Sequence, residues 1–176
     1  MKRIVLIAVF SAALNLFGQV PESGLLLHSS FDKFTTVPDY AVNPKTVVRG
    51  IPQELQMRMY KDPADKLNAV MLNNKEFIGY THQDNFNPQC GTISFWVKPV
   101  NWKMSDNQYF QTFFEVRSGD CAYRLIINKT NAAGFLNAVL MNNGAKYFAR
   151  VRTDWKQGEW HKIDLVWNSS GMKLYV

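Results

Sequence analysis

Gly91–Pro99 reads Gly-Thr-Ile-Ser-Phe-Trp-Val-Lys-Pro and alternates regularly between two kinds of side chain. Ile93, Phe95 and Val97 point one way, and their neighbours point the other. This period of two is typical of a β-strand in a sheet whose two faces differ. The stretch therefore predicts a strand with one apolar, core-facing side.

A second informative stretch occupies residues 158–176. It begins Gly-Glu-Trp-His and continues Lys-Ile-Asp-Leu-Val-Trp. The chain then turns at Asn-Ser-Ser-Gly and ends Met-Lys-Leu-Tyr-Val. Apolar runs of this length on either side of a turn predict two more strands.

Together the two stretches resemble the laminin-G-like branch of the concanavalin A-like lectin and glucanase family. There a GTISFWVKP-type strand precedes a G-x-W-H strand and an L-Y-V strand. The resemblance covers residues 24–176 and is strongest after Cys90. It implies an all-β fold, a two-sheet antiparallel jelly-roll sandwich. It leaves the function open, because this fold hosts lectins, adhesion modules and glycosidases alike.

The rest of the chain fits this class. Before Cys90 we expect strands over 24–31, 46–48, 55–60, 67–72 and 77–80. After it we expect strands over 91–99, 111–117, 122–128, 135–141, 146–152, 160–167 and 173–176. Short strands joined by turn residues, with no helical stretch between them, favour an antiparallel sandwich or barrel. In the family the chain continues beyond the L-Y-V strand, so we expect the C-terminal strands of the domain to be missing here.

One hairpin can be derived from its turn. If Asn143 and Gly144 form a type I′ turn, the pairing of the flanking strands follows. One face then carries apolar pairs and is expected in the core: Leu140 with Tyr147, Ala138 with Ala149, Leu136 with Val151. The other face is mixed and is expected outside: Met141 with Lys146, Val139 with Phe148, Asn137 with Arg150, Phe135 with Arg152.

The N-terminus predicts a separate segment. Lys2 and Arg3 precede an almost unbroken apolar run over residues 4–17, and Gly18 supplies a small residue. This pattern is typical of a secretory signal peptide over residues 1–18, and a buried first helix is the alternative. We expect cleavage before Gln19, a jelly-roll domain over 19–176, no membrane span after cleavage, and a secreted or periplasmic location.

Charge and cysteines constrain the partners. The 176 residues carry 20 basic and 14 acidic side chains, for a net charge of +6. Removal of residues 1–18 leaves 18 basic and 14 acidic side chains, hence +4. Along the sequence these charges are scattered, which argues against nucleic acid. In an oxidising compartment Cys90 and Cys121 form either one disulfide or two buried free thiols.

The sequence offers no pattern for bond cleavage. Glycoside hydrolysis uses two carboxylates that flank the bond. Glu115 stands alone on its predicted strand, and Asp164 lies between Lys162 and Val166. His161 shares its side of the strand with Ile163, which favours a half-buried structural histidine. A non-enzymatic domain is therefore expected, with a glycosidase or polysaccharide lyase of the same fold as an alternative.

Calcium is the cofactor to consider, because many relatives bind it through loop oxygens. Asp84, Asn85 and Asn87 form the best local group of oxygen ligands. The same residues also suit an ordinary polar turn.

Sugar binding needs exposed aromatic rings beside hydrogen-bonding side chains. Six residues are candidate contacts: Trp102, Tyr109, Asn137, Arg150, Arg152 and Trp155. The expected function is a secreted, non-catalytic module that binds extracellular polysaccharide or a cell-surface glycan or partner. A structural spacer without a ligand is the main alternative.

Overall fold

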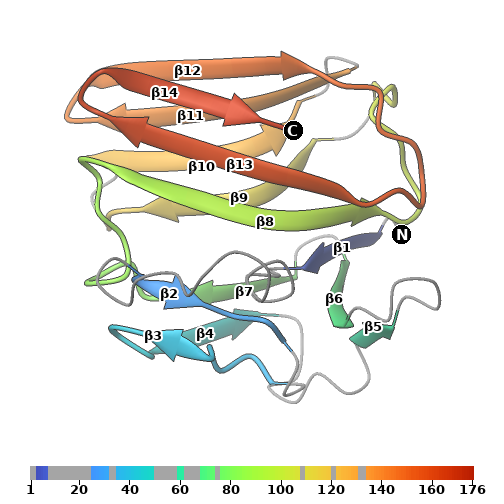
Figure 1. Cartoon of the computed structure of the whole chain (residues 1–176), viewed down its shortest axis with the longest axis horizontal. Helices are drawn as coiled ribbons and strands as arrows, with labels where there is room; N and C mark the ends of the chain where they lie inside the picture. Colours follow the sequence, from blue (N-terminus) through green and yellow to red (C-terminus); the bar gives the residue numbers. More distant parts are fainter. Residues whose placement is uncertain are drawn as a thin grey trace, which may run out of the picture. The chain divides into compact units, whose positions relative to one another are not determined.

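The computed structural model describes residues 3–7, 25–31, 35–49, 59–61, 68–73, 76–107, 110–119, 122–130 and 134–176. The chain divides into two compact units, Met1–Phe86 and Asn87–Val176. Among the described residues there are strands and turns but no helix, and the strand pairs are antiparallel. The predicted all-β antiparallel fold is therefore confirmed (Figure 1).

The first unit is built from short strands. Their bounds are β1 Arg3–Ile7, β2 Leu27–His28, β3 Tyr40–Ala41, β4 Thr46–Arg49, β5 Met59–Lys61, β6 Asn68–Asn73 and β7 Phe77–Tyr80. β6 pairs with both β1 and β5, β2 pairs with β3, and β4 pairs with β7. The expected strands over 67–72 and 77–80 thus form, but they lie in different sheets.

Two other strands expected in this unit differ from the prediction or lie largely outside the described residues. The strand expected over 24–31 is only β2, because the backbone N–H and the hydroxyl of Ser30 both donate to Asp39 Oδ2, at 2.6 and 2.7 Å. Because the N–H of Ser30 is bonded to this carboxylate, it does not pair with a neighbouring strand. Most of the expected strand over 55–60 lies outside the described residues.

Residues 3–7, which belong to the predicted signal peptide, form β1 against β6 in the uncut chain. An apolar run suits a buried strand as well as a signal sequence. Cleavage after Gly18 would remove this strand.

The second unit is a sandwich of two sheets. Its strands are β8 Gly91–Pro99, β9 Gln111–Arg117, β10 Tyr123–Lys129, β11 Phe135–Asn142, β12 Ala145–Arg152, β13 His161–Asn168 and β14 Gly171–Tyr175. One sheet has the order β14-β13-β8, and the other has the order β12-β11-β10-β9. The bounds agree with the sequence-based strands to within one or two residues, since each strand is delimited by turn chemistry.

The core of the second unit lies between the two sheets. Phe95 and Val97 of β8 are buried, as are Ile163, Leu165 and Trp167 of β13. The rings of Phe95 and Phe114 stack with centroids 6.3 Å apart, which joins β8 to β9 across the sandwich. The alternation of apolar residues in the sequence of β8 and β13 therefore matches the alternation of buried side chains.

The derived hairpin is confirmed in its register. Asn143 and Gly144 both have positive φ, 46° and 85°, as a type I′ turn requires, and the eight pairs of β11 and β12 run from Asn142–Ala145 to Phe135–Arg152. Leu136, Ala138 and Leu140 are buried. On β12 the prediction of a core face is partly wrong. Tyr147 is 43% exposed, because β12 is an edge strand with a neighbour on one side only.

Candidate functional site

The predicted aromatic platforms are in the core instead. Trp102 and Trp155 are 2% and 5% exposed, so neither can offer a ring face to a sugar. Phe113 lies between them, with ring centroids 5.9 Å from each. The segments around the two tryptophans are tied together, because Met104 N–H donates to Trp155 O at 3.0 Å. Aromatic side chains in the connecting segments thus close one end of the core, and their assignment as ligand contacts was wrong.

The other predicted contacts have different fates. Arg150 and Arg152 are exposed on β12, as a ligand contact requires. Asn137 is only 1% exposed, and its Oδ1 accepts a 2.6 Å hydrogen bond from Arg150 Nε. It therefore positions Arg150 and is not a surface contact. Tyr109 lies outside the described residues.

The predicted calcium ligands do not fit a cation site. Asn85 Oδ1 accepts the backbone N–H of Asn43, and its Nδ2 donates to Asn43 O and Thr81 O at 2.6 and 2.9 Å. Asn87 Oδ1 accepts the N–H of Gln89 at 2.9 Å. Both amide oxygens thus already accept hydrogen bonds from backbone N–H groups. Among the described residues, no group of three His, Cys, Asp or Glu side chains is placed to hold a metal.

Cys90 is an exposed free thiol, 3.7 Å from Asn87 Nδ2. Cys121 lies outside the described residues. The choice between a disulfide and two thiols therefore stays a prediction, although Cys90 is not the buried thiol that the second option assumed.

The strongest candidate site is the outer face, the side of sheet β12-β11-β10-β9 that points away from β8, β13 and β14. Its position follows from alternation. On β10 the residues Leu125 and Ile127 enter the core, so Arg124, Ile126 and Asn128 project outward. The register brings the outward residues of β11 and β12 beside them: Phe135, Asn137, Val139, Met141, Lys146, Phe148, Arg150 and Arg152.

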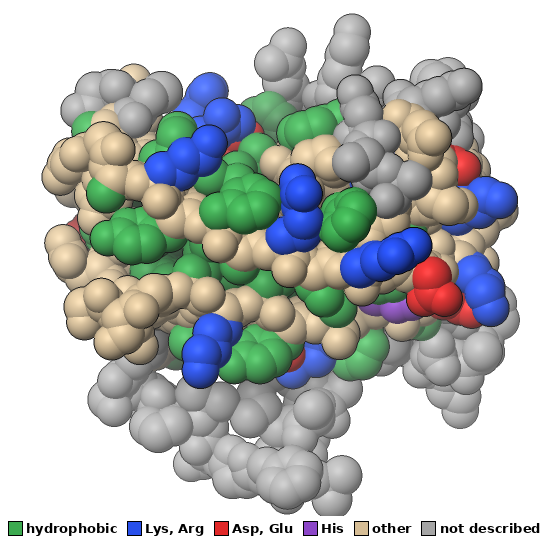
Figure 2. Space-filling model, turned by 90° about the horizontal axis from the view of Figure 1, so that it is seen from above, with side chains coloured by type: hydrophobic (Ala, Val, Ile, Leu, Met, Phe, Trp, Pro, Cys, Tyr) green, Lys and Arg blue, Asp and Glu red, His purple; other side chains and the backbone are tan. Residues whose placement is uncertain are grey.

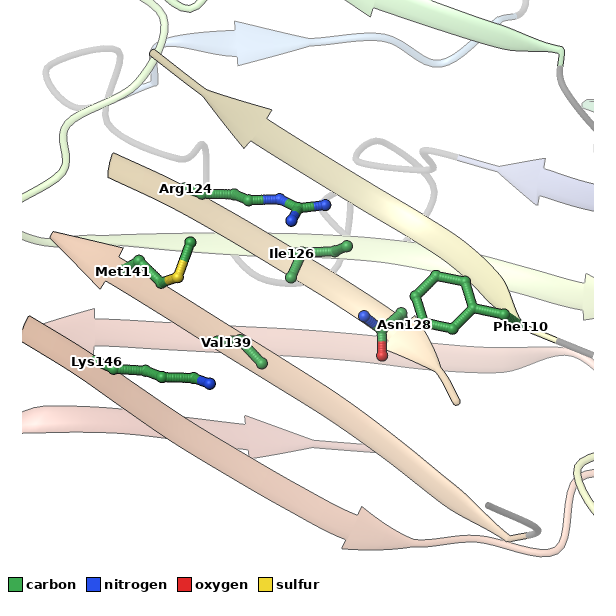
Figure 3. Close-up of a pocket in the computed structure, with 7 residues that line it drawn as sticks. All are labelled: Phe110, Arg124, Ile126, Asn128, Val139, Met141 and Lys146. Atoms are coloured by element: carbon green, nitrogen blue, oxygen red, sulfur yellow. The ribbon is translucent and has the colours of Figure 1, made fainter. Parts of the chain in front are cut away.

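A groove of about 210 Å³ lies on the outer face. It is lined by Phe110, Arg124, Ile126, Asn128, Val139, Met141 and Lys146. Figure 3 shows that these side chains come from β10, β11, β12 and the residue just before β9, and that they project from one side of the sheet. Phe110 is 53% exposed, so an aromatic ring stands at the end of the groove.

The groove combines apolar and polar groups. Ile126 lies opposite Val139 in the register, and the next outward pair is Asn128 opposite Asn137. Asn128 is 6% exposed, and its Oδ1 has no hydrogen-bond partner, nor has Nδ2 of Asn137. Buried polar atoms without partners are uncommon, because desolvation costs about 1–3 kcal/mol. Asn128 Oδ1, which lines the groove, is therefore an acceptor that a ligand hydroxyl or amide could satisfy.

The outer face is predominantly basic. Arg117, Arg124, Lys146, Arg150 and Arg152 project from it. Its one carboxylate among the described strand residues, Glu115, accepts from Arg124 Nε at 3.0 Å. Figure 2 views the molecule from the side on which β12 and β14 lie in Figure 1, and in that view Lys and Arg side chains lie among hydrophobic ones.

Sequence reasoning missed Phe110, Arg124 and Asn128. A signal for Arg124 and Asn128 was present, since both share the alternation of β10 with Ile126. Phe110 precedes its strand by one residue, and only the folded chain places it beside Asn128.

Comparison with known proteins gives a match to a family model. The family model described as the concanavalin A-like lectin/glucanases superfamily, of laminin G type, matches residues 75–176. No curated protein and no solved structure matches the chain. In the part of the chain that the structure describes, no helix has the length and hydropathy needed to cross a bilayer.

Proposed function

Because the chain belongs to the concanavalin A-like lectin/glucanases superfamily, we propose that its second unit is a non-catalytic module that binds extracellular carbohydrate through the outer face. The observation that carries the proposal is the groove in which exposed Phe110 stands beside the buried, unpartnered Asn128 Oδ1.

The chemistry of the groove suits a sugar. A pyranose ring has apolar C–H faces, which pack on an aromatic ring, and hydroxyl edges, which need fixed donors and acceptors. Phe110, Ile126 and Val139 provide apolar contact. Asn128 Oδ1, which has no hydrogen-bond partner within the chain, provides an acceptor for a sugar hydroxyl.

The two acidic side chains within the strands of the second unit, Glu115 and Asp164, support a non-catalytic role. Glu115 is on the outer face and forms an ion pair with Arg124. Asp164 alternates with the buried Ile163 and Leu165, so it projects from the opposite side of the sandwich, 3.1 Å from Lys162. Two carboxylates on opposite sides cannot flank one glycosidic bond, as hydrolysis requires.

The location of the protein outside the cytoplasm is also part of the proposal. The basic and apolar pattern of residues 1–18 supports export and action outside the cytoplasm. N-terminal sequencing of protein recovered from the producing cells tests this part: a mature chain that begins at Gln19 supports it, and a chain that keeps residues 1–18 contradicts it.

The binding role is tested on the purified chain with an array of neutral and acidic polysaccharides, followed by calorimetry on the best ligand. Phe110→Ala should weaken binding about tenfold, because it removes the stacking surface. Tyr175→Ala is the matched control, since Tyr175 is a similarly exposed aromatic at 51% on the other sheet, and it should leave the affinity unchanged.

The alternatives give different results. If no polysaccharide binds, the domain is a spacer and the proposal fails. If a polysaccharide is shortened during incubation, the domain is a hydrolase or lyase and the non-catalytic part fails. If a ligand binds equally well to the Phe110→Ala variant, the outer face is not the binding surface.

A further inference from the structure

We infer that Arg150 is held ready to bind a carboxylate and that the ligand of the outer face is therefore a polysaccharide that contains uronic acids. This inference rests on the proposed function and names its ligand class.

Arg150 is fixed by three contacts. Its guanidinium carbon lies 5.0 Å from the ring centroid of Phe135 and 5.1 Å from that of Phe148. Its Nε donates to Asn137 Oδ1 at 2.6 Å. The register explains the arrangement, because Asn137 is the direct partner of Arg150, and each phenylalanine is two residues before one member of this pair. An arginine held between two rings and an amide loses little conformational freedom on binding.

The contacts leave the right donors for an anion. A guanidinium carries five N–H groups in a rigid planar fork, and the bond to Asn137 uses the one on Nε. The four N–H groups on the terminal nitrogens have no hydrogen-bond partner among the described residues. Two parallel N–H groups match the two oxygens of a carboxylate. The terminal N–H groups of Arg150 are thus held in a fixed orientation and are available to a ligand.

Other cations line up with Arg150. Lys146 and Arg152 project from the same side of β12, four residues before and two residues after it. At a rise of about 3.4 Å per residue, they lie about 14 and 7 Å away along the strand. A row of three positive charges fits a chain that carries several carboxylates better than a single acidic sugar.

The carboxylate on the outer face does not neutralise the positive charges on β12. Glu115 is on β9, at the other edge of the sheet from β12, and it pairs with Arg124. The groove beside Lys146 offers Phe110 and Asn128 for the neutral part of a sugar. A uronic acid residue combines these requirements in one molecule, since it has an apolar ring face, hydroxyls and a carboxylate.

The experiment uses the whole chain and two probes of equal length, polygalacturonate and its carboxyl-reduced, neutral form. Affinities are measured by calorimetry for the native chain, Arg150→Ala, Arg150→Lys and Lys173→Ala. We expect polygalacturonate to bind at least tenfold more tightly than the reduced form. Arg150→Ala should lose at least tenfold, and Arg150→Lys should lose much of the same affinity, because an ammonium cannot form the two parallel bonds.

The Lys173→Ala variant is the control. Lys173→Ala removes the same charge from exposed β14 and should change the affinity by less than twofold. If the reduced polymer binds as well as polygalacturonate, or if Arg150→Lys equals the native chain, the inference is overturned while the proposed function stands. Binding of heparin or duplex DNA without binding of polygalacturonate also overturns it. If no polysaccharide binds at all, the proposed function fails.

Discussion

The imidazole ring of His161 lies parallel to the indole ring of Trp155, with ring centroids 4.4 Å apart and an interplanar angle of 6°. This stack ends a row of aromatic rings that continues through Phe113 to Trp102. His161 is half-buried. Its Nε2 lies 3.8 Å from Glu159 Oε2, and this nitrogen has no hydrogen-bond partner. The structure thus agrees with the interpretation of His161 as a structural residue.

The first prediction concerns pH. Burial lowers the pKa of His161 below its ordinary value of 6.5, although Glu159 and Asp154 oppose the shift. Between 6.5 and the lower folded-state pKa, the unfolded chain binds more protons than the folded chain. The contribution of His161 to the free energy of unfolding is therefore present above 6.5 and is lost as the pH falls below it.

Urea denaturation between pH 7.5 and 5.0 checks this. The difference in stability between the native chain and His161→Gln should shrink as the pH falls through this window. The interpretation is wrong if the native chain gains stability over the variant on acidification.

The second prediction concerns Gly91, which faces Trp167 in the register of β8 and β13. A Cβ atom at Gly91 would lie 2.5 Å from the indole ring of Trp167, which is 3% exposed and donates to Asn87 O. Gly91→Ala should therefore lower the free energy of unfolding by about 1–3 kcal/mol, as overpacking does. Gly119→Ala is the control, because nothing lies within 4 Å of its Cβ position. Equal stability of the two variants in a denaturant titration would contradict the close approach.

The third prediction separates core aromatics from surface aromatics. Trp102→Ala should lower the free energy of unfolding by about 3–5 kcal/mol, because it leaves a large cavity beside Phe113. Phe110→Ala should change it by less than about 0.5 kcal/mol, since half of that side chain is in solvent. Thermal and chemical unfolding of both variants checks this, and a Trp102→Ala variant of native stability would be inconsistent with its burial.

The fourth prediction concerns Lys129, which is fully buried although its side chain ends in a polar amine. Its Nζ donates to the backbone oxygens of Asp106 and Thr130, at 2.5 and 3.2 Å. Lys129→Met keeps an unbranched apolar side chain of similar reach but takes donors from these carbonyls, so it should lower the free energy of unfolding by about 1–3 kcal/mol. Lys173→Met, on exposed β14, is the control and should be nearly neutral. A stabilised Lys129→Met chain would mean that the cost of burying the polar amine exceeds the value of its hydrogen bonds.

The pattern in β8 and the turn at Asn143 and Gly144 were sufficient to predict the strands and one hairpin register. They act locally: alternation fixes which side of a strand is apolar, and positive φ at two residues fixes the pairing of β11 with β12. The prediction of the site residues was less accurate. Trp102 and Trp155 stand in polar segments of the sequence, and no local signal shows that these segments fold over the end of the core.

The sequence by itself determined an antiparallel all-β fold, because strand periodicity and turn residues depend on neighbours along the chain. Only the tertiary structure decided which of these side chains share a surface. Arg117, Arg124, Lys146, Arg150 and Arg152 are scattered along the sequence, and they converge on one face because four strands pair side by side with their outward residues in register. Neighbours across a sheet are set by pairing and not by distance in sequence, so the basic face exists only once the strands have paired.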